Sequence, residues 1–294
     1  QRALVLLKVR NDLDTALAYL ACLQAGHPLM LIDADLAPAL SQPLLDTYRP
    51  NFVIDGQLLK HHNPETVQLH PELALMLSTS GSTGSPKLVR LSYDNVQANA
   101  DSIISYLRLT AMEVAITTMP LHYSFGLSIL NSHLAIGAKV VLTSKSLMTR
   151  EFWQYVQEHQ VTSLSGVPYI YQMLRKMRYE RFNTNSVRYL AQAGGKLDTD
   201  TTRYFVEQCN KKSQSFFVMY GQTEATARIT YLPSEQLNQK LGSIGIAIPG
   251  GRLFIRTEQG ELTEQSGVEG ELVYQGPNVM LGYAESVNDL VVGD

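Results

Sequence analysis

Cysteine is scarce in this sequence, and the two cysteines present, Cys22 and Cys209, are far apart. Neither has another Cys or a His nearby at the spacing of metal ligands, and the seven histidines form no metal-binding pattern. The sequence therefore predicts neither a disulfide framework nor a zinc site. A reducing cytoplasm is the expected location.

Strong net charge and long apolar runs are also missing. The formal net charge of -3 provides no basic field for nucleic acid. No apolar run approaches the roughly 20 residues that span a bilayer, so no membrane span is expected. A composition of 45% hydrophobic and 17% charged residues is ordinary for a globular protein. With 294 residues, one large or two moderate domains are expected.

Hydrophobic periodicity predicts alternating helices and strands. Asp12 can cap a helix that ends before Gly26, and an unbroken apolar strand follows over residues 29–33. This alternation is typical of an α/β fold with a parallel sheet. We expect an α/β core over residues 1–228 and, where Gly and Pro increase, an antiparallel β subdomain over 229–294. Further helices are expected over residues 40–48, 92–107, 130–135, 151–157, 168–177 and 199–209, and strands over 52–54, 114–119, 139–142, 161–164, 187–192, 216–219, 252–256 and 271–274.

A loop rich in Ser, Thr and Gly, residues 78–87, is the first candidate site. Its glycines allow tight turns, and its hydroxyls, amides and Lys87 suit a polyphosphate. The pattern G-x-x-x-x-G-K-[ST] does not fit, because Leu88 follows the lysine. Pro86 disfavours a helix here and favours a strand-loop-strand hairpin. The alternative is a flexible surface loop.

Two further segments follow predicted strands, where ligands of α/β proteins bind. In Tyr220-Gly221-Gln222-Thr223-Glu224, the Tyr offers a flat face for a purine, the Thr a hydroxyl for phosphate, and the Glu a carboxylate for Mg²⁺. By itself, such a pentapeptide is typical of an ordinary loop. Residues 193–197 contain Gly194 and Gly195, which fit either a close approach to a ligand or a plain turn.

Residues 79–87 match [ST]-[ST]-G-[ST]-T-G-x-P-K throughout, and residues 220–224 match Y-G-x-T-E. In both motifs the chain resembles the acyl-adenylate-forming (AMP-binding) enzymes, which include acyl-CoA synthetases, luciferases and peptide-synthetase adenylation domains. Further similarities lie at residues 23–33 and 165–168 and, more specifically, at residues 270–283, including Tyr283, where the implied role is structural, as β hairpins. The resemblance covers nearly the whole chain. It implies the large N-terminal domain of that fold, with layered parallel-rich sheets, helices and a smaller antiparallel β subdomain.

The family continues into a ribose-binding Asp motif and a small C-terminal domain with a catalytic Lys. The last three residues resemble the Asp motif only superficially, and Asp294 is not assigned to ribose. Because the sequence also starts without Met, we expect a chain that is cut at both ends.

The resemblance also implies roles for single residues. Tyr220 would stack on adenine, Thr223 would contact the α-phosphate, and Glu224 would hold magnesium. Lys87, His122, Thr223 and Glu224 are the candidate catalytic residues. The candidate nucleotide-binding residues are Thr79, Ser80, Gly81, Ser82, Thr83, Gly84, Lys87, Gly194, Gly195, Tyr220, Gly221 and Thr223.

Residues 119–127 resemble a family stretch in which an aromatic residue precedes a His near the reacting carboxylate. Here the order is reversed, as His122-Tyr123, so His122 is either a polar contact beside the acyl group or a structural histidine. No Asp follows to pair with an ammonium group, which disfavours an α-amino acid as substrate. Tyr169 and Met173 indicate an apolar or aromatic acyl group.

The implied reaction is activation of a small carboxylic acid by ATP and Mg²⁺, with release of pyrophosphate. The acyl group would then pass to a thiol, either coenzyme A or the phosphopantetheine of an acyl-carrier protein. The alternatives are a nucleotide hydrolase that uses the same loop and a non-catalytic nucleotide-binding or scaffold homologue. Without the C-terminal Lys, we expect the chain to bind better than it turns over.

Overall fold

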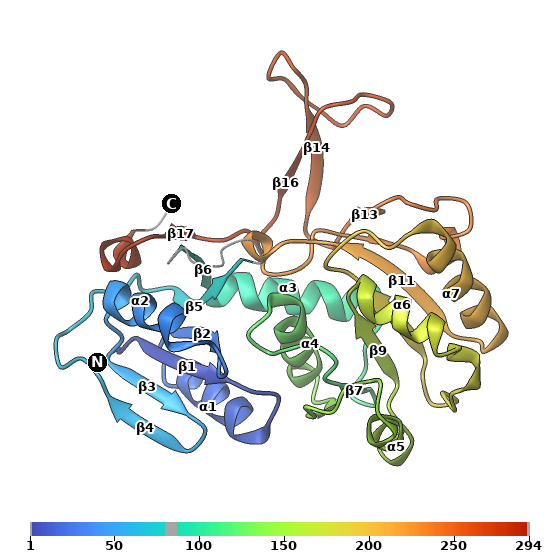
Figure 1. Cartoon of the computed structure of the whole chain (residues 1–294). Coiled ribbons are helices and arrows are strands. Elements are labelled where there is room, and N and C mark those ends of the chain that lie inside the picture. Colours follow the sequence, from blue (N-terminus) through green and yellow to red (C-terminus); the bar gives the residue numbers. More distant parts are fainter. Residues whose placement is uncertain (1, 80–86, 293–294) are drawn as a thin grey trace.

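The computed structural model describes residues 2–79 and 87–292. It contains two seven-stranded sheets and one three-stranded sheet (Figure 1). The two large sheets are rich in parallel pairs and are covered by helices, whereas the small sheet is antiparallel. The expected α/β fold with a smaller antiparallel sheet is therefore confirmed.

The first large sheet has the strand order β17-β6-β5-β2-β1-β3-β4. Its strands are β1 (Val5–Val9), β2 (Leu29–Asp33), β3 (Phe52–Asp55), β4 (Leu58–His61), β5 (Leu73–Ser78), β6 (Leu88–Ser92) and β17 (Gly282–Ala284), accompanied by helices α1 (Leu13–Gln24) and α2 (Pro38–Tyr48). Strands β5 and β6, which flank residues 79–87 in the sequence, pair antiparallel. The predicted strand-loop-strand hairpin is therefore correct.

The second large sheet has the order β13-β12-β11-β10-β9-β7-β8. Its strands are β7 (Val114–Ile116), β8 (Lys139–Val141), β9 (Ser163–Gly166), β10 (Tyr189–Gln192), β11 (Ser215–Tyr220), β12 (Thr230–Leu232) and β13 (Ile246–Ala247). Its helices are α3 (Tyr93–Leu107), α4 (Ser124–Ala135), α5 (Arg150–Glu158), α6 (Pro168–Lys176) and α7 (Thr199–Lys211). Short 3₁₀ helices lie at Tyr179–Arg181, Thr223–Ala225, Ser234–Gln236 and Val287–Val291.

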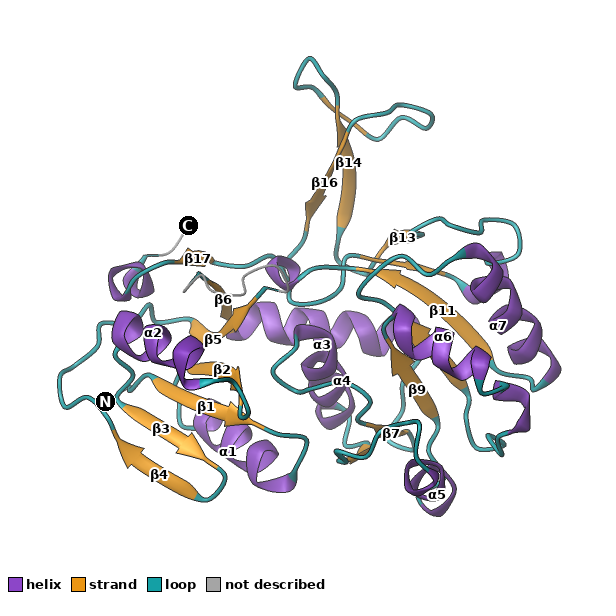
Figure 2. Cartoon of the chain, in the orientation of Figure 1, coloured by secondary structure: helices purple, strands orange, loops and turns teal. Residues whose placement is uncertain are grey.

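Helices α3 and α4 lie between the two large sheets (Figure 2). In α4, Leu127 and Leu130 pack against the core of the first sheet, whereas Phe125 and Ile129 pack against the second. Helix α4 therefore connects both sheets, and its N-terminus is held at a fixed place between them.

Local signals explain the helix ends. The Asp12 side chain accepts a hydrogen bond from the Thr15 amide at 2.8 Å, and Ser92 forms a capping box at the start of α3. Helix α4 was expected only from residue 130, but it begins at Ser124. Its first turn contains Gly126, where a Cβ atom would lie 2.2 Å from the Pro120 carbonyl oxygen. The small residues that permit this packing hide the helical pattern in the sequence.

The strands after residue 229 belong to all three sheets. Strands β12 and β13 extend the second sheet beyond β11, and β17 pairs antiparallel with β6 of the first sheet. Only β14 (Arg252–Arg256), β15 (Leu262–Thr263) and β16 (Glu271–Gln275) form the separate small sheet, which projects away from the large ones (Figure 1). The division into residues 1–228 and 229–294 stays a prediction.

In the described ranges 2–79 and 87–292, no helix is both long and apolar enough to cross a membrane.

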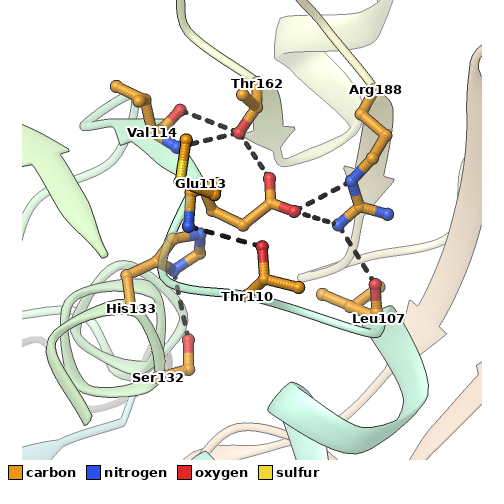
Figure 3. A network of polar contacts seen from close by, with 9 residues as sticks. Leu107, Thr110, Glu113, Val114, Ser132, His133, Thr162 and Arg188 are labelled. Atoms are coloured by element: carbon orange, nitrogen blue, oxygen red, sulfur yellow. Dashed lines mark hydrogen bonds and ion pairs between the residues drawn. The ribbon is translucent and has the colours of Figure 1, made fainter. Parts of the chain in front are cut away.

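A polar network around the buried Glu113 connects the starts of several strands in the second sheet (Figure 3). The Glu113 carboxylate is 2.7 Å from the Arg188 guanidinium and accepts a hydrogen bond of 2.5 Å from the Thr162 hydroxyl. The same hydroxyl accepts a hydrogen bond from the Val114 amide at 2.9 Å. These contacts join the start of β7 to the starts of β9 and β10, so the network fixes β7 relative to those two strands.

His133, in the last turn of α4, lies beside this network (Figure 3). Its Nδ1 is 2.8 Å from the Ile129 carbonyl oxygen, and its buried Nε2 has no hydrogen-bond partner in the described part of the chain. Burial lowers the pKa of His133 below its usual value of 6.5, Arg188 lowers it further, and the Ile129 carbonyl and Glu113 oppose this shift. A second proton would have no acceptor at Nε2, so the neutral form is favoured.

We expect His133 to make the fold less stable in acid. Because the folded state binds this proton less readily than the unfolded state, stability is complete above pH 6.5 and falls as the pH drops below that value. In the His133→Gln variant, the free energy of unfolding should fall less steeply between neutral and acidic pH, by up to about 1.4 kcal/mol per pH unit. Urea unfolding at several pH values measures this slope. Identical slopes in both proteins would contradict the assignment.

Candidate active site

A cavity of about 280 Å³ opens where strands of the second sheet end beside the N-terminus of α4. The end of β5 contributes Thr79, and the end of β10 contributes Ala193 and Gly194. The remaining lining residues are Tyr123, Ser124 and Phe125 at the start of α4, and Gly221, Gln222, Thr223, Glu224, Ala227 and Arg228 after β11. Segments far apart in the sequence therefore meet at strand ends, where α/β proteins bind ligands.

Two glycines allow the backbone to approach its neighbours at this cavity. A Cβ atom at Gly221 would lie 1.8 Å from the Ala227 carbonyl oxygen, because residues 221–228 fold back on themselves. Gly194 has a φ of +80°, and a Cβ atom there would lie 2.8 Å from the Tyr123 hydroxyl. Larger residues at either position would displace the cavity wall.

Thr223 and the N-terminus of α4 lie side by side in one wall of the cavity. The hydroxyls of Thr223 and Ser124 are 3.2 Å apart, and either can donate. The N-cap residue of α4, Tyr123, makes no side-chain capping hydrogen bond. The N-terminal amides of a helix attract anions, so this wall is suited to an oxygen of a phosphate or carboxylate.

Tyr283 of β17 connects Glu224 with Lys87. Its hydroxyl donates a hydrogen bond of 2.7 Å to Glu224 Oε1, and this carboxylate raises the pKa of Tyr283 to about 12. Lys87 Nζ lies 3.7 Å from the centre of the same ring and 3.6 Å from Glu285 Oε1. The sequence indicated only a structural role for Tyr283, and its contact with Glu224 was missed because it depends on pairing between distant strands.

The structure brings together five of the predicted site residues around the cavity, and Lys87 reaches this group through Tyr283. The five are Thr79, Gly194, Gly221, Thr223 and Glu224. Tyr220, at the end of β11, is 37% exposed, and Gly195 lies against Pro168; neither lines the cavity. Ser80, Gly81, Ser82, Thr83 and Gly84 lie outside the described residues.

His122 lies elsewhere. It lines a second cavity of about 500 Å³ together with Tyr169 and Met173. Its Nε2 is 4.0 Å from the Asp33 carboxylate; burial lowers the pKa of His122, and Asp33 opposes this shift. The adjacent Tyr123 lines the first cavity. The His122-Tyr123 pair is therefore divided between two cavities.

Glu224 is a suitable magnesium ligand only together with other groups. Within residues 2–79 and 87–292, no three or more His, Cys, Asp or Glu side chains lie close enough to hold a metal ion by themselves. Mg²⁺ in proteins commonly binds one or two carboxylates along with phosphate oxygens and water. A single carboxylate beside a cavity suited to phosphate fits that requirement.

Arg228 was missed by the sequence analysis. It is 2% exposed and lines the cavity, with its guanidinium 4.0 Å from the centre of the Phe125 ring. The sequence signal that could have found it is a single charged residue within an otherwise uncharged segment, residues 225–230, all of which the structure shows to be buried. Such a position requires either a partner within the protein or a ligand.

An α/β fold with a cavity of this kind at its strand ends defines a ligand-binding domain suited to phosphates. The chain belongs to the AMP-binding enzyme family, whose pattern matches residues 55–284. The family resemblance expected from the sequence is therefore confirmed.

Named relatives are acyl-CoA ligases. A 2-succinylbenzoate–CoA ligase from Bacillus velezensis is 32% identical over 221 residues, which cover 75% of this chain and 43% of that protein. A feruloyl-CoA synthase from Amycolatopsis is 27% identical over 213 residues, 72% of this chain and 42% of the relative. The chain thus spans less than half the length of these relatives.

Solved structures show the same fold. A double mutant of o-succinylbenzoate CoA synthetase from Bacillus subtilis has a TM-score of 0.80 at 25% identity, covering 96% of this chain and 62% of that one. The N-terminal domain of FACL13 from Mycobacterium tuberculosis has a TM-score of 0.82 at 18% identity, covering 96% and 78%. The predicted large N-terminal domain of the adenylate-forming fold is confirmed.

The fold-back at Gly221 can be tested by Gly221→Ala. The new methyl group would meet the Ala227 carbonyl, so we expect a loss of about 1 to 3 kcal/mol in the free energy of unfolding. Gln222→Ala, at the exposed neighbouring position, is the matched control and should change stability little. Urea unfolding measures both. Equal stability of the two variants would show that the segment can relax away from this contact.

Proposed function

We propose that this chain is the nucleotide- and acyl-binding part of an enzyme that activates a carboxylic acid with ATP. The reaction would give an acyl-adenylate and pyrophosphate, and the acyl group would then pass to a thiol. The observation that carries the proposal is a single cavity lined by Gly194, Gly221, Thr223 and Glu224, with Thr79 at the start of the phosphate loop. Structures of the Bacillus subtilis relative in complex with AMP and with an acyl-adenylate support it.

The acid would attack the α-phosphorus in line with the departing pyrophosphate. This step requires that charge on the phosphates be reduced and that the two reactants be held in position. Thr223 and the N-terminal amides of α4 would hold the α-phosphate oxygens, since they line the same wall. Lys87 would contact the outer phosphates, Tyr220 would stack on adenine, and the backbone at Gly194 would approach the base.

Glu224 would hold Mg²⁺ together with phosphate oxygens, and the ion would neutralise part of their charge. The hydrogen bond from Tyr283 to Glu224 keeps this carboxylate in place and leaves its other oxygen available. Tyr283 is thus a positioning residue for Glu224.

Coenzyme A is the proposed acceptor, supported by the names of the relatives. The phosphopantetheine of an acyl-carrier protein is the other thiol of suitable chemistry. The acid is proposed to be small, because the cavity of about 280 Å³ must also admit the α-phosphate. His122 stays a candidate only for a role beside the second cavity, and a cytoplasmic location stays a prediction.

Titration calorimetry with AMP and with acyl-sulfamoyl-adenosines tests the proposal. These analogues resemble the acyl-adenylate and require no turnover. We expect an analogue to bind more tightly than AMP, and Thr223→Val to weaken both by about tenfold, the value of one hydrogen bond to a charged group. Thr199→Val, at an exposed position in α7, is the matched control and should bind as the unchanged protein does.

Two results would contradict this function. Phosphate released from ATP without any acid would indicate a nucleotide hydrolase. Failure to bind AMP and every analogue would favour a non-catalytic homologue.

A further inference from the structure

The Arg228 guanidinium is a buried cation on the wall of the proposed acyl-adenylate cavity. Its Nε and one terminal nitrogen are buried without a hydrogen-bond partner, as far as the structure describes the chain. Among residues 2–79 and 87–292, none of the ion pairs includes Arg228. The guanidinium lies over the Phe125 ring. Burial raises the pKa of Tyr106, and the charge of Arg228 and a hydrogen bond with it oppose this rise; the charge of Arg228 likewise opposes the rise in the pKa of the half-buried Tyr123. A tyrosine hydroxyl supplies no negative charge at neutral pH.

A buried charge without a counter-charge destabilises a folded protein. The contact with the Phe125 ring is favourable, but a ring face replaces only part of the hydration that a guanidinium loses. The site therefore has an unmet requirement for negative charge.

The start of α4 adds to this requirement. Helix α4 has 12 residues, its first turn borders the same cavity, and its N-cap residue Tyr123 makes no side-chain capping hydrogen bond. The partial positive charge of a helix N-terminus and the Arg228 guanidinium therefore act on the same space. Both features favour anions: the α-phosphate at the start of α4, as proposed above, and a second oxyanion at Arg228.

Arg228 lies deeper in the cavity than most of the residues proposed for the nucleotide, so the oxyanion that it would bind is a different group from the nucleotide. Gly221 and Glu224 are half-buried and Tyr220 is exposed, so these residues proposed for the nucleotide lie toward solvent. Thr223, proposed for the α-phosphate, is 6% exposed and is the most deeply buried of this group. Arg228 and Phe125 are each 2% exposed, at the inner wall. The reacting carboxylate is a poor partner for Arg228. It loses its negative charge as the acyl-adenylate forms, so its attraction to Arg228 would weaken toward the transition state, whereas catalysis requires binding that strengthens there.

We propose that Arg228 binds a second anionic group on the acyl chain, so that the acid activated here is a dianion, such as a dicarboxylic acid. This inference rests on the proposed function, because it names the class of acid that the same site takes. It replaces the expectation of a purely apolar or aromatic acyl group. Arg228 is then a specificity-determining residue.

Matched pairs of acyl-sulfamoyl-adenosines test this inference. The acyl groups are succinyl, glutaryl and isophthaloyl, each with its distal carboxylate free or as the methyl ester. We expect one free acid to bind the unchanged protein at least about tenfold more tightly than its ester. In Arg228→Met the ratio of the two affinities, free acid to methyl ester, should fall to near one, and Arg228→Lys should retain part of this preference for the acid. Arg252→Met, at an exposed position in β14, is the matched control and should keep the full ratio.

Thermal unfolding gives an independent readout. Because methionine removes an uncompensated buried charge, Arg228→Met should be as stable as the unchanged protein or more stable. Higher stability combined with lost discrimination is the result expected of a binding residue. A marked fall in stability would assign Arg228 a structural role and overturn the proposal.

The remaining outcomes separate the two claims. Equal and tight binding of acids and esters would overturn the claim that the substrate is a dianion and would leave the proposed function intact. An equal loss of affinity for AMP, acids and esters in Arg228→Met would place the guanidinium on the nucleotide phosphate and also overturn it. If neither AMP nor any analogue binds, both claims fail. The ratio of acid to ester affinity in the unchanged protein tests the dianion proposal even if a variant does not fold.

Discussion

The cavity depends on the close backbone approach of Gly221 to the Ala227 carbonyl. Because residues 221–228 fold back at this contact, Thr223, Glu224 and Arg228 all line one space instead of following β11 outward. Helix α4 closes the other side, and its packing against both large sheets holds its N-terminus in place. One steric constraint therefore determines where the polar groups of the site meet.

Charge is arranged by depth around this cavity. Glu224 and Lys87 lie toward solvent and share Tyr283 as a partner, which suits magnesium and the outer phosphates. Arg228 lies at the inner wall, where a cation is costly without an anion. The solvent side of the cavity therefore suits magnesium and phosphates, and its inner wall suits an anion. In the proposed function, the phosphate lies between them, next to Thr223 and the start of α4.

Features that depend on local sequence could be predicted, and features that depend on distant pairing could not. The cap of α1 at Asp12, the hairpin around residues 79–87 and the cavity position of residues 221–224 follow from neighbouring residues. The contact of Tyr283 with Glu224 requires β17 to pair with β6, which no local pattern specifies. The start of α4 was missed because its small residues look like a loop, and Arg228 because burial is not visible in composition.

The central claim is that one cavity holds both the phosphate of the adenylate and the acyl group. A crystal structure of the chain with a carboxylate-ended acyl-sulfamoyl-adenosine tests it most directly. The account predicts adenosine beside Tyr220 and Gly194, the sulfamate beside Thr223, and the distal carboxylate on Arg228. An acyl group bound instead in the cavity of about 500 Å³ beside His122 and Tyr169 would contradict it.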